Sequence, residues 1–457
     1  MKKVLLILFG GRIIPNVLTI LHLEPDIIVP IVPILPKDQT EDLDAFKKSV
    51  NKWLLEEKKS KCVWFDDNNP GTPNKVNPYD KEDVRKACNN IVQKVQDKLQ
   101  EQKKQEQEEQ EQEEIEWIFN ITSGTSTMSI GAYEAAKELL VQRKTVKCWY
   151  LNTAKTRIET LVGEEEGASF NKKLFTISIK DYAAVHNKVL TTNKQEDELP
   201  SEERRLEFAN FLISSQDYIK VLSEMLTRPD DNNNSVEYQM RHRSSELDPC
   251  TRSFSGKQNE FFVKAVLKKA HEYGLIRIIR KMDMKWSFEI SWQQFHFLNG
   301  GWLELYVCHK VSNIREEDGK PLFEDIQRNR FVHNKTEEGF HKQYENELDV
   351  SMIYNAQLFI IECKAGKDVK DAKTIFTLDS VANAFGGGFV GKYLVAGLSK
   401  EEIKNLVPGK EEIKNQEYEN FQKRLRARRI KLITWEDLRD LDRIFRQEAK
   451  EPDYPRI

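Results

Sequence analysis

The sequence predicts an α/β protein with two domains of different kinds. Strand-like apolar runs alternate with helical patterns from the first residue to about residue 160, and such alternation is typical of a parallel sheet covered by helices. A polar stretch rich in Pro, Asn and Ser, from Arg228 to Gly256, then precedes a second series of helices and strands. At the usual ~150 residues per domain, a chain of 457 residues has room for about three such units.

The first strand is the apolar run from Val4 to Phe9. It imitates the start of a signal peptide, but it ends at Gly10-Gly11-Arg12 with no small-residue cleavage site after it. A continuous apolar run that stops at glycine favours a buried strand of a parallel sheet.

Two further short apolar runs follow, Ile27 to Leu35 and Cys62 to Phe65. Pro30 and Pro33 limit how much of the former can be a central strand, because proline has no N–H for the hydrogen-bond ladder. The sequence therefore predicts the first strand in full but limits the length of the second.

A helix and a strand complete the alternation. Apolar residues recur at helical spacing from Asp83 to Leu99, whereas every residue from Gln100 to Glu114 is Gln, Glu or Lys. The latter cannot supply a core, so a solvated helix extension or a loop is expected. Trp117 to Ile121 is the next strand, and Cys148 to Leu151 closes a sheet of Rossmann type.

The second half begins with helices. Residues 199–226 look helical, and Phe261 to Tyr273 forms an amphipathic helix that Gly274 can terminate. Ile276 to Ile279 and Trp286 to Ile290 have the composition of strands.

The segment from Leu348 to Lys364 carries the chemistry. Asn355-Ala356 interrupts two strand-like runs, which predicts a β-hairpin. Side chains alternate on a strand, so Glu362 and Lys364 share one face, and Asp349 near the start of the first strand can lie across from them.

Two carboxylates and a lysine at strand ends make a hard oxygen site for Mg²⁺ or Mn²⁺. In that interpretation Lys364 orients a water or stabilises negative charge in the transition state. Glu304, at the edge of an apolar helical stripe, is a third available acid. The alternatives are a buried structural ion pair for Glu362 and Lys364 and an ordinary solvated helix carboxylate for Glu304.

Composition excludes several classes of protein. Lys and Arg number 71 and Asp and Glu 74, so the net charge of −3 argues against a globally basic nucleic-acid binder. No apolar run reaches the ~18–20 residues that span a bilayer, so no membrane association is expected. The six cysteines form no CxxC pair, which fits reduced thiols in a cytoplasmic protein.

Two stretches of the first domain resemble the signatures of a CARF domain, the Rossmann-like sensor of type III CRISPR systems. Gly10 to Asn16 is similar to its first loop, and Asn120 to Met128 is similar to its second signature. The usual Gly-Gly-Thr-Lys turn is Ser123-Gly124-Thr125-Ser126 here, so the phosphate-facing lysine is missing; Arg12 or Lys155 can compensate.

The second half resembles the restriction-endonuclease-like, PD-(D/E)xK part of CARF-fused ancillary nucleases. The matching stretches are Gly300 to Glu304, the strand of Asp349, Glu362-Cys363-Lys364, and Leu378 through Gly388. The two resemblances together imply a CARF sensor at 1–165, a helical segment and linker at 166–256, and a nuclease domain at 257–457.

The resemblance implies a homodimer that binds one cyclic oligoadenylate, most often cyclic tetra-adenylate, across its two-fold axis. Binding would favour the arrangement in which the nuclease sites admit substrate, which is allosteric activation. The implied activator-binding residues lie in the two signature loops: Gly11, Arg12, Ile14, Asn16, Thr122, Ser123, Gly124, Thr125 and Ser126.

The nuclease half implies cleavage of DNA, RNA or both with Mn²⁺ or Mg²⁺ and little sequence preference, in antiviral defence. Asp349 and Glu362 would bind the metal with the Cys363 carbonyl, Lys364 would act on the water, and Glu304 would be a further catalytic acid. The alternative is a non-catalytic sensor of cyclic oligonucleotides that controls a partner, and a third possibility is that the first domain cuts its own ligand.

Overall fold

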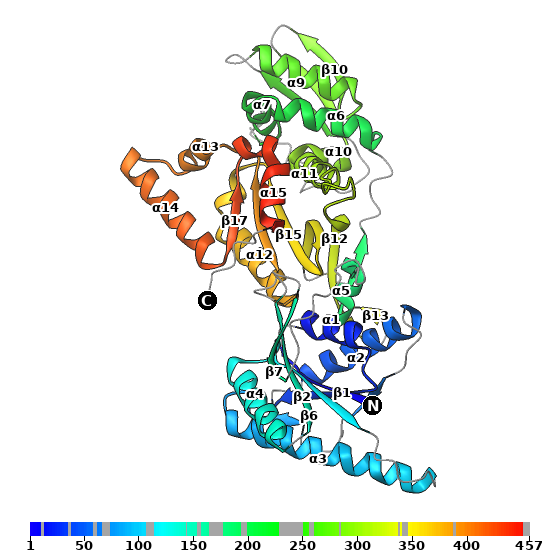
Figure 1. Ribbon diagram of the computed structural model, residues 1–457. Helices are drawn as coiled ribbons and strands as arrows, with labels where there is room; N and C mark the ends of the chain where they lie inside the picture. The colour runs from blue at the N-terminus through cyan, green and yellow to red at the C-terminus, as the bar shows by residue number, and fades with distance from the viewer. Residues whose placement is uncertain are drawn as a thin grey trace.

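The computed structural model places three parts one above another, with the N-terminal domain at the bottom of Figure 1 and a mainly helical unit at the top. The structure describes the following residues: 1–10, 13–34, 38–57, 62–65, 74–106, 114–142, 144–152, 157–163, 177–192, 199–227, 250–255, 260–282, 285–336, 339–340, 346–386 and 390–450.

The N-terminal domain is built on one sheet with the strand order β3-β2-β1-β5-β6-β7, and β4 pairs with β2. Its neighbours are parallel except for β6 and β7. The strands are β1 (Lys2–Leu8), β2 (Ile27–Pro33), β3 (Val63–Trp64), β4 (Lys75–Val76), β5 (Ile115–Asn120), β6 (Thr145–Asn152) and β7 (Arg157–Val162). The predicted α/β fold with a Rossmann-like sheet is confirmed.

Helices cover both faces of this sheet. The helices are α1 (Ile14–Leu23), α2 (Asp38–Glu57), α3 (Lys81–Glu106) and α4 (Ser126–Val141). Leu5 and Ile7 of β1 share a core with α1 and α2, whereas Val4 and Leu6 face α3 and α4. Successive residues of β1 therefore enter opposite cores, which explains why the whole strand is apolar. The Gln/Glu/Lys run continues α3 as far as Glu106.

Strand β2 shows how a parallel strand can contain prolines. It lies between β1 on one side and two short strands on the other. β3 pairs with β2 at Ile27 and Ile28, and β4 pairs at Val32 and Pro33. Pro30 falls between the two pairings, so its missing N–H costs the ladder no bond on that side.

The second domain contains a sheet with the order β13-β12-β14-β15-β16-β17. Its strands are β12 (Glu324–Thr336), β13 (Gly339–Phe340), β14 (Asn346–Tyr354), β15 (Gln357–Lys364), β16 (Gly391–Ala396) and β17 (Ile430–Ile433). Its helices are α10 (Trp292–His296), α11 (Trp302–Ser312), α12 (Ala372–Ala384), α13 (Lys400–Asn405), α14 (Glu411–Ala427) and α15 (Leu441–Lys450).

The predicted β-hairpin is confirmed as β14 and β15. Tyr354 pairs with Gln357, so the turn has two central residues, Asn355 and Ala356. Both have positive φ angles, 52° and 58°, as a type I′ turn requires.

The segment between the two domains is more than a linker. It contains α5 (Ile179–Val185), β8 (Lys188–Thr192), α6 (Glu202–Ile213) and α7 (Gln216–Thr227), and β8 pairs with β12 of the second sheet. The helical stretch predicted at 199–226 is two helices, because Ser214 and Ser215 break it: Ser215 Oγ accepts the N–H of Asp217 at 3.2 Å.

A small three-stranded sheet completes the upper unit. It comprises β9 (Cys250–Ser255), β10 (Arg277–Met282) and β11 (Lys285–Ile290), and α9 (Glu260–Glu272) packs beside it. Gly274 follows α9 with φ 77° and ends the helix as predicted. Apolar side chains of α6, α7 and α9 share one core with α11 and α15, so this unit belongs to the second domain.

Other sequence-based expectations concern membranes and cysteines. In the described ranges, no helix has the length and apolar character needed to cross a bilayer. Cys62, Cys88, Cys148, Cys308 and Cys363 are free thiols.

Candidate functional site

The candidate active site lies where β14 and β15 pass beneath α11. Val350 of β14 pairs with Ile361 of β15, which brings Asp349 opposite the Glu362 end of its neighbour. Asp349 Oδ2 accepts the backbone N–H of Cys363 at 2.7 Å, and its side chain is buried. This bond fixes the Asp349 carboxylate beside the predicted Glu362 and Lys364.

Glu362 and Lys364 lie together on one face of β15, as the two-residue period predicts. Lys364 Nζ approaches Glu362 Oε1 to 2.6 Å, and the two side chains are 28% and 12% exposed. Cys363 between them points into the core under α11. The end of β15 therefore has one charged face, which carries Glu362 and Lys364, and one apolar face, which packs in the core.

Helix α11 brings Glu304 to the same place. The buried neighbours Trp302 and Leu303 anchor the first turn of the helix, and Glu304 emerges beside Cys363 and Lys364 at the surface of one cavity. A short π-helix, Phe297–Gly301, precedes α11; irregular turns of this kind are frequent at functional sites. The alternative of a solvated helix carboxylate does not describe Glu304.

The carboxylates perturb one another strongly. Burial, followed by the neighbouring Glu347, raises the pKa of Glu304 to about 7. Burial, Glu362 and Glu304 raise the pKa of Asp349 well above its usual range. Burial alone would lower the pKa of Lys364, but Glu362 and Asp349 raise it instead. The negative carboxylates repel one another in this desolvated site, and a bound cation would reduce that repulsion.

Two charged residues of this site were not predicted from the sequence. Glu347 lies two residues before Asp349 on β14, and its pKa is raised by partial desolvation and then by Glu362. Arg328 of β12 pairs with Val350 and lowers the pKa of Glu304. The two-residue period of β14 could have identified Glu347, whereas Arg328 has no local signal.

The donor set suits a hard divalent cation, because it consists of carboxylate oxygens. Among the residues that the structure describes, however, no three His, Cys, Asp or Glu side chains lie close enough to hold a metal ion. Lys364 takes one oxygen of Glu362, and the Cys363 N–H takes one oxygen of Asp349. The residue types therefore fit a metal, and the second oxygens of Glu362 and Asp349 are not used in these two contacts.

A cavity of about 690 Å³ adjoins this cluster. Glu304, Cys363 and Lys364 are among its lining residues, as are Gly300 and Gly301. A Cβ atom at Gly300 would meet nothing within 4 Å, so the fold leaves open space there.

The two signature loops of the N-terminal domain meet through their glycines. A Cβ atom at Gly10 would lie 2.8 Å from the Cα of Gly124, and Gly124 itself has φ 84°. Only glycine allows this approach and this backbone angle. Gly11, Arg12 and Lys155 lie outside the described residues.

Several predicted activator-binding residues are buried in an internal network. Asn16 Nδ2 donates to the Leu8 carbonyl at 2.9 Å, and Asn16 Oδ1 accepts from Asn120 Nδ2 at 2.9 Å. Thr122 Oγ1 donates to Asn120 Oδ1 at 2.7 Å and accepts the Leu151 N–H at 2.7 Å. Ile14 and Ser123 are also buried. These side chains shape the loops from within, whereas Ser126 is exposed and Thr125 is partly so.

The N-terminus of α4 lies at this surface. Thr125 caps the helix by accepting the Met128 N–H at 3.1 Å, and its hydroxyl donates to the Pro78 carbonyl at 2.6 Å. The N–H groups of a helix N-terminus favour anions such as phosphate.

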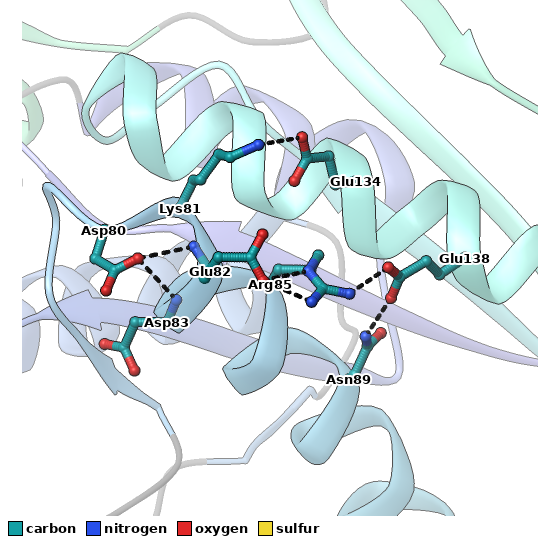
Figure 2. A network of polar contacts seen from close by, with 8 residues as sticks. All are labelled: Asp80, Lys81, Glu82, Asp83, Arg85, Asn89, Glu134 and Glu138. Carbon is teal, nitrogen blue, oxygen red and sulfur yellow. Dashed lines mark hydrogen bonds and ion pairs between the residues drawn. The ribbon is translucent and has the colours of Figure 1, made fainter.

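A polar network fixes α4 against α3 (Figure 2). Arg85 of α3 pairs with Glu82 and with Glu138 of α4, and Asn89 donates to Glu138 at 2.7 Å. Lys81 pairs with Glu134 at 2.9 Å. The network holds α4, and with it the turn that precedes the helix.

Two protein families match this chain. The Card1 CARF domain matches residues 74–182. The endonuclease domain of Card1-like proteins matches residues 292–432, the part that contains Glu304, Asp349, Glu362 and Lys364. No curated protein matches the sequence of this chain.

Two solved structures are similar over almost the whole chain. Can2 from Sulfobacillus thermosulfidooxidans in complex with cyclic tetra-adenylate has 16% identity and a TM-score of 0.61, and the match covers 98% of this chain and 97% of Can2. Protein VC1899 from Vibrio cholerae has 18% identity and a TM-score of 0.63, and the match covers 98% of each chain. At these identities the likeness concerns the fold.

Proposed function

The chain is a CARF–nuclease fusion of the Card1 kind, and on that premise we propose that it is a nuclease activated by a cyclic oligoadenylate in type III CRISPR defence. The observation that carries the proposal is the cluster of Asp349, Glu362, Lys364 and Glu304 beside one cavity, which Glu304 and Lys364 line, inside the part that matches the endonuclease family. A domain that only senses a ligand has no need for carboxylates that raise one another's pKa.

The residues divide the work of phosphodiester hydrolysis among them. Asp349 and Glu362 would hold Mn²⁺ or Mg²⁺ together with the Cys363 carbonyl. The bound ion would supply positive charge at the phosphate and a more acidic water. Lys364, whose pKa is raised, stays protonated at neutral pH, so it donates hydrogen bonds and stabilises charge and is not a base. Glu304, with a pKa of about 7, can exchange a proton near neutral pH.

The activator would bind at the loops that follow β1 and β5. The exposed N-terminus of α4 favours phosphate, and Can2, which has the same fold, was solved with cyclic tetra-adenylate. A two-fold symmetric ring suits two copies of the domain in a homodimer. Gly10 and Ile13 of the first signature loop also line a cavity of about 300 Å³ with Asn334 and Asn383 of the second domain. The activator loop thus borders the nuclease domain, which gives binding a direct route to the second site.

A cleavage assay with a catalytic variant tests the proposal. Supercoiled plasmid, single-stranded DNA and RNA would each be incubated with Mn²⁺, with and without cyclic tetra-adenylate, using wild type and Glu362→Gln. We expect cleavage by the wild type only with activator, and a loss of at least 100-fold in Glu362→Gln because a charged ligand becomes a neutral amide.

Activator binding, measured in parallel by calorimetry, separates the alternatives. Glu362→Gln should bind cyclic tetra-adenylate like the wild type, because the substitution lies in the other domain. Tight binding without cleavage of any substrate would support the non-catalytic sensor. Cleavage without activator would contradict the proposed control.

A further inference from the structure

The two family matches leave residues 183–291 between them unassigned, and this segment supplies one wall of the active-site cavity. Helix α7 contributes Lys220, Ser223 and Glu224 to the lining, which also contains Lys364 and Lys367. Resting on the proposed nuclease function, we propose that Lys220 of α7 and Lys367 hold the substrate backbone from the two sides of the catalytic residues.

Helix α7 presents both polar and apolar side chains to the cavity: Lys220, Ser223 and Glu224, and beside them Ile219, Leu222 and Leu226. Its apolar residues Ile219, Leu222, Met225 and Leu226 are buried in the core shared with α9 and α11. Lys220, Ser223 and Glu224 are spaced by three and four residues, so they lie on one face of the helix. Helix α7, in the upper unit of Figure 1, is therefore anchored in the shared core by its apolar residues, and Lys220, Ser223 and Glu224 lie at the cavity.

The two lysines are available to a ligand. Both side chains are exposed, and neither forms an ion pair or hydrogen bond with any residue that the structure describes. Lys367 begins the short 3-10 helix Lys367–Lys370, three residues after Lys364. An ammonium group on each side of the catalytic lysine can neutralise the phosphates that flank the scissile one.

The acidic residues of the cavity do not cancel this arrangement. Glu304 belongs to the catalytic cluster, and Glu402 is committed to the capping box of Ser399, whose N–H it accepts at 2.9 Å. The remaining acids of the lining are Asp368, next to Lys367, and Glu224, four residues after Lys220 on the α7 wall. Both oppose a polyanion, and Glu224 provides a charge change of the opposite sign on the same helix as Lys220.

The size of the effect follows from counterion release. Each phosphate neutralised on a single strand contributes about −0.7 to the slope of log K, the logarithm of the binding constant, against log salt. Relative to 1 M salt, one such contact therefore strengthens binding by a factor of ~5 at 0.1 M NaCl and by under ~2 at 0.5 M. Lys220→Ala should therefore weaken binding about 5-fold at 0.1 M salt, and the double variant with Lys367→Ala about 25-fold.

The test measures binding of fluorescein-labelled single-stranded DNA of about 20 nucleotides by anisotropy, over a range of NaCl concentrations. All proteins are full-length, carry Glu362→Gln to prevent cleavage, and are saturated with cyclic tetra-adenylate. The matched control is Lys268→Ala, an exposed lysine on α9 of the same unit that does not line the cavity.

We expect Lys220→Ala to lower the salt slope by about 0.7, Lys268→Ala to leave it unchanged, and Glu224→Gln to tighten binding. In the otherwise wild-type enzyme, Lys220→Ala should raise KM and spare kcat, which a merely structural defect would not do. The proposal is overturned if Lys220→Ala binds within 2-fold of Lys268→Ala at 0.1 M salt, or if its loss of affinity does not shrink at high salt.

The outcome is separable from that of the proposed function. Lysine-dependent DNA binding by a protein that never cleaves would support the α7 wall and contradict the nuclease. Activated cleavage with an unchanged KM in Lys220→Ala would support the nuclease and contradict the α7 wall.

Discussion

His186 at the junction of the two domains makes stability depend on pH. Its ring stacks on Tyr182 at 5.2 Å between centroids and meets Phe385 of the second domain edge-on at 6.0 Å. Nδ1 lies 2.8 Å from the Tyr182 carbonyl, and Nε2 is buried with no hydrogen-bond partner in the described part of the chain. Burial, with a smaller effect of Lys188, lowers the pKa of His186 to about 4.

The sign and size of the effect follow from linkage. The unfolded chain binds the proton with a pKa of about 6.5, so between pH 6.5 and 4 the unfolded state holds more protons than the folded one. The free energy of unfolding is thus unaffected by His186 above about pH 7 and falls as the pH drops toward 4. Lowering the pKa from 6.5 to about 4 corresponds to ~3 kcal/mol in total, of which ~2 kcal/mol is lost by pH 5.

Urea unfolding of wild type and His186→Phe at pH 7.5 and pH 5 measures this difference. Phenylalanine preserves the stacking and cannot be protonated, so the variant should lose ~2 kcal/mol less than wild type between the two pH values. The urea slope increases with protein size, and for a chain of 457 residues it should be at least the ~3 kcal/mol per M at the upper end for small proteins. The wild-type midpoint should therefore fall up to ~0.7 M further than that of the variant. The control is His271→Phe, because His271 of α9 is exposed.

Equal shifts of the midpoint in wild type and His186→Phe would refute the reasoning, since His186 would then already be charged or solvated in the folded protein. A shift in the His271→Phe control as large as that in His186→Phe would refute it too. In that case the pH dependence would come from other groups.

Two further predictions concern packing and the active site. Gly131→Ala should lower the Tm by an amount equivalent to about 1–3 kcal/mol, because a Cβ there would lie 2.5 Å from the Lys81 carbonyl oxygen; Gly366→Ala, where a Cβ meets nothing within 4 Å, should leave the Tm unchanged. Asp349→Asn should abolish cleavage and raise the urea midpoint of the metal-free protein, because it removes one of several repelling carboxylates while Oδ1 can still accept the Cys363 N–H. A lower midpoint would show that the carboxylates do not strain the fold.

The elements that the sequence predicts well are those specified locally. The hairpin of β14 and β15 follows from alternating apolar residues around Asn355-Ala356, and the turn has the positive φ angles that a two-residue loop requires. The same local rule places Glu362 and Lys364 on one face. By contrast, Pro30 argues against a central strand, and only the gap between β3 and β4 explains why β2 tolerates it.

The elements that the sequence does not predict depend on contacts between distant segments. Strand β8 joins the second sheet through β12, although nothing in its five residues distinguishes it from an extended linker. Lys220 is one lysine among the 71 Lys and Arg residues of the chain, and only the burial of the opposite face of α7 turns it toward the cavity. Charge patterning cannot select such a residue, because its neighbours in space are far from it in sequence.

The roles within the active site depend on tertiary structure in the same way. The spacing of Glu362 and Lys364 predicts that the two side chains meet. It does not predict that Lys364 remains protonated, because this depends on Glu362 and Asp349, which raise the pKa of Lys364. Glu304 lies in a different element, α11, and its pKa near 7 arises from burial and from Glu347 on β14. A carboxylate becomes a candidate acid or base through its surroundings, so the sequence can indicate which residues meet, and the packed structure decides which of them can carry a proton.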